Sequence, residues 1–93
     1  MEIAFISAWM DARKQAEALG IRMRPVTDAM KEAHRCLSGH RESDGFWALA
    51  DAGHLEWSLE ALAVKKQFTA LFSDEEANNA LTRLMEAGYS FSK

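Results

Sequence analysis

The chain has 93 residues, of which 48% are hydrophobic and 27% charged, and its formal net charge is −3. These values exclude disorder as the main state, since the apolar fraction is high and the net charge is low. No apolar run is long enough to span a membrane, so we expect no membrane partner. The length predicts one domain, residues 1–93, with one hydrophobic core.

The composition predicts an all-α fold. Strong helix formers dominate the chain, whereas β-branched residues are few and never alternate as they do in strands. We therefore expect a single small domain in which four or five short helices pack as an irregular bundle.

The first predicted helix covers residues 2–19, where apolar side chains recur at helical spacing, and Gly20 follows as its left-handed terminating residue. Pro25 then turns the chain, because the residue before a proline is pushed out of helical dihedrals. A second helix is expected to start at Thr27, a plausible N-cap, and to end at Gly39.

Residues 38–45 form the most polar segment of the chain and are predicted to be a loop. Ser43 or Asp44 is expected to cap a short third helix that begins near Phe46 and ends or kinks at Gly53. These two side chains are thus interpreted as local helix-capping groups.

A longer helix is predicted over residues 54–72, and it is apolar on more than one side. Such a helix is either central to the domain or buries a second face against a partner. The last helix has the clearest start signal, because Ser73 and Glu76 match a capping box, and Gly88 is expected to end it. Phe91, beyond this helix, is expected to dock on the protein.

The polar face of the last helix is expected to lie in solvent. Its members are Asp74, Glu75, Glu76, Asn78, Asn79, Thr82, Arg83 and Glu86. The last two helices weakly resemble a helix-turn-helix pair, but three carboxylates stand where the second helix would approach a groove. Repulsion from phosphate there opposes DNA binding.

The histidines and the cysteine give no metal-binding or catalytic pattern. On a helix, His34 and Cys36 point about 200° apart, Gly39 interrupts the pair Cys36 and His40, and adding His54 matches no standard zinc spacing. The chain also lacks a phosphate-binding loop and the common hydrolase motifs. We therefore predict no catalytic residue, no metal, no cofactor and no enzymatic activity.

Cys36 is the only cysteine, so an intramolecular disulfide is excluded. This usage favours a reducing compartment, and the simplest expectation is a cytoplasmic protein.

Charge is distributed unevenly along the chain. Residues 13–41 carry seven Lys and Arg against three acidic residues, a local charge of +4, while the remainder carries −7. A basic region of this kind meets either phosphates or an acidic protein surface. A nucleic-acid-binding regulatory protein that uses residues 13–41 is therefore the alternative function.

The favoured function is protein–protein contact. Tryptophan, methionine and arginine are enriched at interface hot spots, and the chain has three tryptophans and five methionines. The predicted partner-binding residues are Trp9, Trp47 and Trp57 as apolar anchors, with Arg22, Arg24, Arg35 and Arg41 as orienting charges. We expect a small non-enzymatic inhibitor or adaptor of a larger protein, or a homodimer. Small acidic helical proteins of phages and mobile elements include inhibitors of this class.

Overall fold

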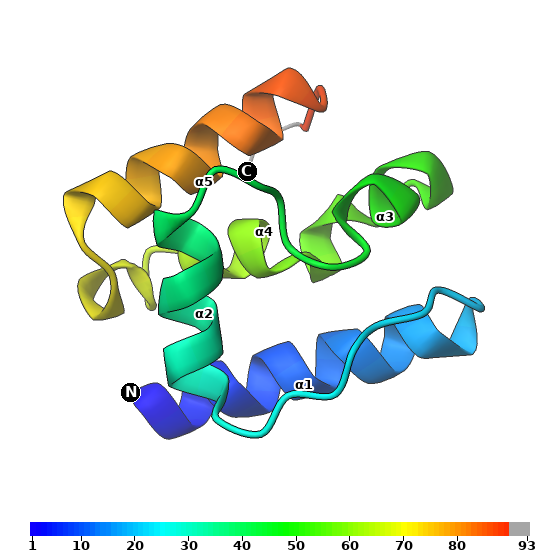
Figure 1. Cartoon of the computed structure of the whole chain (residues 1–93), viewed down its shortest axis with the longest axis horizontal. Helices are drawn as coiled ribbons and strands as arrows, with labels where there is room; N and C mark the ends of the chain where they lie inside the picture. Colours follow the sequence, from blue (N-terminus) through cyan, green and yellow to red (C-terminus); the bar gives the residue numbers. More distant parts are fainter. Residues whose placement is uncertain (90–93) are drawn as a thin grey trace.

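The computed structural model describes residues 1–89, which form five α-helices, two short 3₁₀-helices and no β-strand (Figure 1). The elements in chain order are α1 (Glu2–Ala18), α2 (Ala29–Ser38), α3 (Phe46–Ala52), η1 (Leu55–Trp57), α4 (Leu59–Ala63), η2 (Thr69–Leu71) and α5 (Asp74–Glu86). The all-α prediction is confirmed. No helix of residues 1–89 has the length and apolar character needed to cross a membrane. The predicted docking of Phe91 lies outside the described residues.

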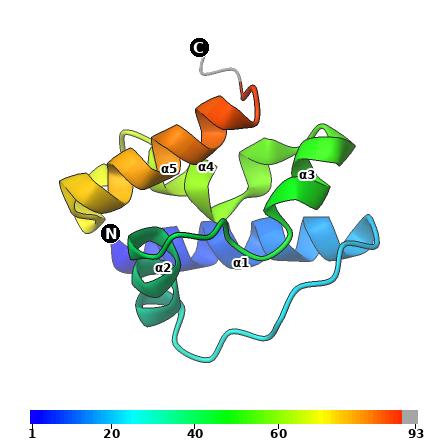
Figure 2. The same ribbon diagram turned by 45° about the horizontal axis from the view of Figure 1, so that its top comes forward.

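Helix α2 crosses the molecule from α1 on one side to α5 on the other, and α4 lies between those two (Figure 1, Figure 2). All five residues of α4 are buried, so this short helix is the centre of the core. The linker of residues 19–28 has no regular structure and runs back along α1 (Figure 2). One side of α1 therefore faces the core, and the linker covers part of another.

Helix α1 forms as predicted. Its buried residues are Phe5, Trp9, Ala12 and Ala16. Their spacing of three and four places them on one helical stripe. Gly20 follows with φ +90°, and the N–H of Ile21 donates to the carbonyl of Ala16 at 3.2 Å. This is the Schellman arrangement, in which a left-handed glycine lets the chain turn back and satisfy the last carbonyls.

Helix α2 begins one residue later than predicted. Asp28, not Thr27, is the N-cap, and its carboxylate accepts the N–H of Lys31 at 3.2 Å. A carboxylate at this position also interacts favourably with the positive end of the helix dipole. Gly39 ends the helix, as predicted.

Neither Ser43 nor Asp44 caps α3, so that prediction is wrong. The N-cap is Gly45, whose φ is +77°, and no side chain caps the helix. The side chains of Ser43 and Asp44 bind other segments instead, as described below. A Cβ on Gly45 would lie 2.7 Å from the terminal methyl of Met23, a flexible group that can shift, so it is the positive φ that favours glycine here. Gly53, with φ +79°, ends α3 as predicted.

The predicted helix over residues 54–72 is wrong, because the chain there folds as η1, α4 and η2. Ser58 has an extended backbone, and its hydroxyl accepts the N–H of Ala61 at 3.1 Å, which starts α4 as a new helix. A turn then separates α4 from η2. The apolar residues that seemed to surround one long helix are divided among these short segments and the residues that flank them, and the buried Phe68 and Phe72 lie on either side of η2.

The capping box that starts α5 is confirmed. The Ser73 hydroxyl accepts the N–H of Glu76 at 3.1 Å, and the Glu76 carboxylate accepts the N–H of Ser73 at 2.9 Å. Gly88, with φ +78°, follows the C-terminal end of the helix, as predicted.

The predicted solvent face of α5 is wrong at three positions, because α2 packs on it. Glu76 lies 2.8 Å from Nδ1 of His34, and the Asn79 amide donates to the carbonyl of Leu37 at 2.8 Å. Arg83 is buried. These polar groups join two helices, whereas a pattern of polar residues alone predicts exposure.

Ser73→Ala is expected to lower the free energy of unfolding by about 0.5–2 kcal/mol, because it removes the hydroxyl that satisfies a backbone N–H of α5. Urea denaturation measures this loss. The control is Ser7→Ala, an exposed position inside α1, where alanine is the better helix former. An equal loss in both variants would contradict the capping argument.

Candidate functional site

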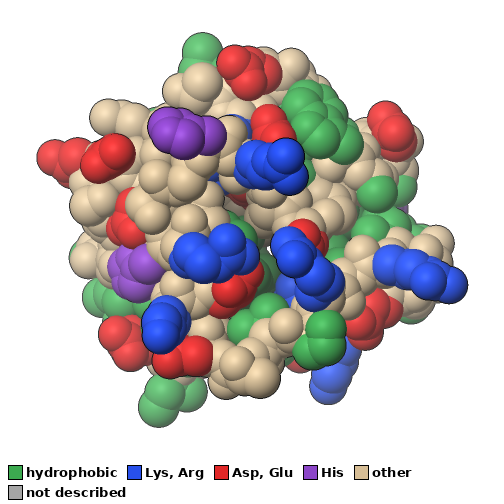
Figure 3. Space-filling model, in the orientation of Figure 1, with side chains coloured by type: hydrophobic (Ala, Val, Ile, Leu, Met, Phe, Trp, Pro, Cys, Tyr) green, Lys and Arg blue, Asp and Glu red, His purple; other side chains and the backbone are tan. Residues whose placement is uncertain are grey.

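A cavity of about 170 Å³ opens between α1, the 19–28 linker, α2 and the loop before α3. Its lining residues are Trp9, Arg13, Met23, Arg24, Pro25, Val26, Glu32, Arg35, Cys36, Ser43, Asp44, Trp57, Ser58 and Leu59. We call this cavity the arginine hollow. Figure 3 shows Lys and Arg side chains on both sides of a hollow in this face, with hydrophobic side chains beside and within it.

The floor of the arginine hollow is apolar. Trp9 is only 4% exposed and belongs to the core. Trp57 is half-buried, and its ring stacks on His54 with 4.1 Å between ring centroids. Leu59 of α4 completes the floor. Trp57 therefore offers the larger accessible apolar surface at the bottom of a polar rim, whereas Trp9 is a core residue that is almost fully covered.

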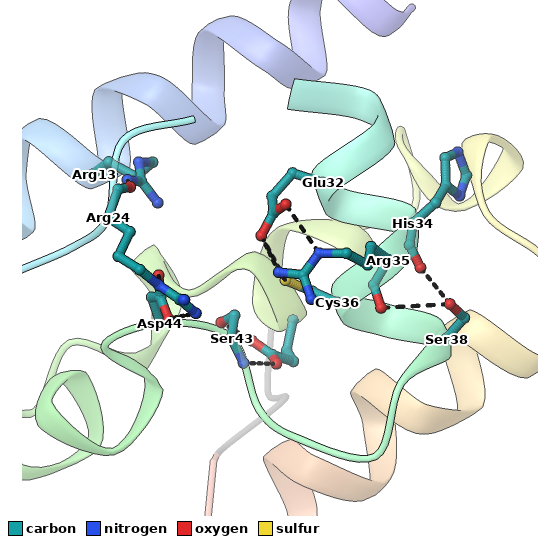
Figure 4. A network of polar contacts seen from close by, with 10 residues as sticks. Arg13, Arg24, Glu32, His34, Arg35, Cys36, Ser38, Ser43 and Asp44 are labelled. Carbon is teal, nitrogen blue, oxygen red and sulfur yellow. Dashed lines mark hydrogen bonds and ion pairs between the residues drawn. The ribbon is translucent and has the colours of Figure 1, made fainter. Parts of the chain in front are cut away.

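One side of the rim is an ion pair between the linker and the next loop. Arg24 donates from Nε and Nη2 to the two carboxylate oxygens of Asp44, at 3.0 and 3.1 Å. Arg13 on α1 donates to the carbonyl of Arg24 and places its guanidinium 5.8 Å from the Trp9 ring centroid. The bidentate bond to Arg24 lowers the pKa of Asp44. These contacts hold the linker in place over α1 (Figure 4).

The other side of the rim is an ion pair within α2. The guanidinium of Arg35 bonds both carboxylate oxygens of Glu32, with its Nε at 3.0 Å from Oε1. This bond lowers the pKa of Glu32. In Figure 4 the Arg24 and Arg35 side chains extend toward each other from the two sides of the hollow. Two guanidinium groups thus face a common opening.

A second cavity of about 270 Å³ adjoins the arginine hollow, with which it shares Arg24, Arg35, Cys36 and Asp44. It extends the basic surface to Arg41.

The structure brings together part of the predicted partner-binding set. Trp9, Trp57, Arg24 and Arg35 line the arginine hollow, and Arg41 lines the adjoining cavity. Two residues lie elsewhere: Arg22 lines a separate shallow cavity with Ile21 and Met23, and Trp47, which is 49% exposed, lies on α3 against Phe46.

The predicted partner-binding set did not include three members of the rim, Arg13, Glu32 and Asp44. Arg13 could have been found, since it follows Trp9 by four positions on a predicted helix and so lies on the same face. The pairing of Arg24 with Asp44 has no sequence signal, because it depends on how two loops meet.

A buried ion pair holds the loop that carries Asp44. Glu60 of α4 is 0% exposed, and it accepts from the N–H and the hydroxyl of Ser43 at 2.9 and 2.6 Å. Arg83 of α5 donates to Glu60 at 3.1 Å and to the carbonyl of Gly39 at 2.7 Å. Ser43 is therefore held by its bonds to Glu60 of α4, and the next residue, Asp44, is positioned against Arg24.

The histidines and Cys36 do not converge. Among the residues that the structure describes, no group of three His, Cys, Asp or Glu side chains is arranged to hold a metal ion. His34 pairs with Glu76, and His54 pairs with Glu56. Burial, together with the Glu32 carboxylate, raises the pKa of the Cys36 thiol to about 11. Cys36 is therefore a protonated thiol at neutral pH, which makes it a poor nucleophile.

Alkylation of Cys36 by iodoacetamide is expected to be slow and strongly dependent on pH. The thiolate is the reactive form, so at about pH 8 the rate should be on the order of 100-fold below that of an ordinary thiol. The rate should still rise up to a pH near the thiol pKa of about 11, and Glu32→Gln should increase it. Steric shielding alone would leave an ordinary pH profile, and such a profile would contradict the raised pKa.

The fold and the arginine hollow define a small all-α domain with a concave site that is basic at its rim and apolar at its floor. Comparison with protein-family models, with curated proteins and with solved structures found no match to this chain.

Proposed function

We propose that this chain is a small non-enzymatic binding protein that regulates a larger protein by direct contact, as an inhibitor or an adaptor. The observation that carries the proposal is the arginine hollow, in which Arg24 and Arg35 flank a floor built from Trp9 and Trp57. Tryptophan and arginine are the residue types that dominate binding energy at protein interfaces. The single cysteine suits a reducing compartment such as the cytoplasm.

Protein is favoured over nucleic acid as the partner because the hollow combines an apolar floor with rim arginines that are each paired with one carboxylate. Arg24 is paired with Asp44, and Arg35 with Glu32. A phosphate backbone could use only the donors that these pairs leave free, and it would leave the apolar floor uncovered. A protein partner can use the apolar floor and the arginines together. That partner is a different protein or a second copy of this chain.

The test is capture of partners from a nuclease-treated native lysate with three forms of the tagged protein. The site variant is Arg24→Ala/Arg35→Ala. The matched control is Lys65→Ala/Lys66→Ala, which removes two charges from an exposed turn that lines neither cavity. We expect one protein to be retained in stoichiometric amount by wild type and control, and to be lost from the site variant.

Retention that is equal in all three forms would contradict a role for the arginine hollow. Recovery of nucleic acid when nuclease is left out, with retention that falls steeply as salt is raised, would instead favour the nucleic-acid alternative.

A further inference from the structure

We propose that the partner places an acidic segment on the arginine hollow, inserts one apolar side chain against Trp9 and Trp57, and sets a carboxylate between Arg24 and Arg35. This inference rests on the function proposed above and specifies the chemistry of the partner.

The hollow by itself has the size of one side chain, and the adjoining cavity of about 270 Å³ leaves room for the rest of a segment. The hollow's volume of about 170 Å³ is close to that of a ~150 Å³ cavity that holds benzene. Sites for small molecules are commonly ~300 Å³ or larger and enclose most of the ligand. One leucine-sized or phenyl-sized side chain fits this space, and the rest of its segment then lies across the rim.

The charges at the rim indicate that this segment is acidic. Three arginines and two carboxylates line the hollow, a net charge of +1. All of them except Asp44 lie in the stretch of residues 13–41, which carries +4. A basic segment would be repelled by this net positive lining and would find the two carboxylates already bonded to Arg24 and Arg35. An acidic segment is complementary to this lining, and complementarity of this kind gives specificity and fast association.

Both arginines keep a donor for an incoming carboxylate. Arg24 and Arg35 each use Nε and Nη2 on their own carboxylate partner. Within the described residues the Nη1 group of neither arginine makes a hydrogen bond. Because the two side chains extend toward each other across the hollow (Figure 4), these groups are the donors that a bound carboxylate would meet.

Asp44 is then an internal competitor of the partner. Its carboxylate already occupies Arg24, so removal of its charge leaves the guanidinium free for the incoming segment. The ion pair is exposed on the arginine side, with 78% of the Arg24 side chain accessible, and an exposed pair of this kind contributes little to stability. Asp44→Asn is therefore expected to strengthen binding of the acidic segment. If the Arg24–Asp44 pair had only a structural role, the substitution would leave binding unchanged or weaken it.

The test uses three capped pentapeptides at low salt: Asp-Asp-Leu-Asp-Asp, Asp-Asp-Ala-Asp-Asp and Lys-Lys-Leu-Lys-Lys. Binding is measured by tryptophan fluorescence, to which Trp9 and Trp57 contribute, and by protection of Cys36 from alkylation.

We expect Asp-Asp-Leu-Asp-Asp to bind in the millimolar range or better. Asp-Asp-Ala-Asp-Asp should bind about tenfold more weakly, and Lys-Lys-Leu-Lys-Lys should not bind. Asp44→Asn should tighten binding several-fold, while Arg24→Ala/Arg35→Ala should weaken it at least tenfold.

Several results would overturn the inference: no binding of the acidic peptide, equal binding of the lysine peptide, or tighter arginine-dependent binding of a 12-base-pair DNA duplex. Failure of the peptides together with arginine-dependent capture from the lysate removes this inference and leaves the proposed function standing. Capture that does not depend on the arginines removes the proposed function itself. Lys65→Ala/Lys66→Ala should bind the acidic peptide as the wild type does.

Discussion

Arg83→Met is expected to lower the free energy of unfolding by about 3–5 kcal/mol, a large part of the ~5–15 kcal/mol that stabilises a domain. The substitution leaves the Glu60 carboxylate with 0% exposure and without its cation. It also takes the donor at 2.7 Å from the carbonyl of Gly39. Urea denaturation followed by tryptophan fluorescence measures the loss.

The double variant Arg83→Met/Glu60→Gln distinguishes two causes of the lost stability: an unpaired Glu60 carboxylate in the core, and the lost packing of the Arg83 side chain. A glutamine at position 60 keeps an oxygen that accepts from Ser43 and carries no charge into the core. We expect the double variant to be more stable than Arg83→Met alone, because the penalty comes mainly from an uncompensated buried charge. Lys66→Met, in an exposed turn, should leave stability close to that of the wild type. A double variant less stable than the single one would contradict this account.

The buried ion pair also explains why the candidate site depends on the core. Ser43 is bonded to Glu60, and the next residue, Asp44, is bonded to Arg24. Loss of Arg83 should therefore loosen the rim of the arginine hollow as well as the core.

Much of the helical structure could be predicted from local signals. The stripe of α1, its terminating Gly20 and the Ser73 capping box each depend on residues within about four positions of one another. Interactions over such short separations do not depend on the rest of the fold. The same signals failed over residues 54–72, where an apolar pattern on several sides does not reveal that the chain bends around the core.

The candidate site could be predicted only in part. The sequence predicts that residues 13–41 are basic, and it indicates Trp57 as an apolar anchor. The pairs Arg24 with Asp44 and Glu60 with Arg83 are separated by 20 and 23 positions. Because ions of opposite charge are common in any sequence, such pairs become specific only when the fold has brought their segments together.

Phe5→Ala is expected to lower the free energy of unfolding by about 3–5 kcal/mol, because it removes a large ring from the core and leaves a cavity. Phe5 is 0% exposed, and its ring packs edge-on against Phe68 and Phe72, with centroids 5.4 and 5.2 Å apart. These partners flank η2, so the ring joins α1 to the segment before α5. The surroundings are held by several elements, which limits how far the cavity can collapse.

Ile3→Ala in the same helix is the matched control, since Ile3 is 83% exposed. A change within about 0.5 kcal/mol is expected there. Similar losses in both variants would contradict the role of the buried stripe, since alanine is the better helix former at either position. A large loss at Phe5 alone would show that α1 is held by its contact with the C-terminal half of the core. Trp9 lies one turn further along α1, so the packing of Phe5 against Phe68 and Phe72 would then also hold Trp9 at the floor of the arginine hollow.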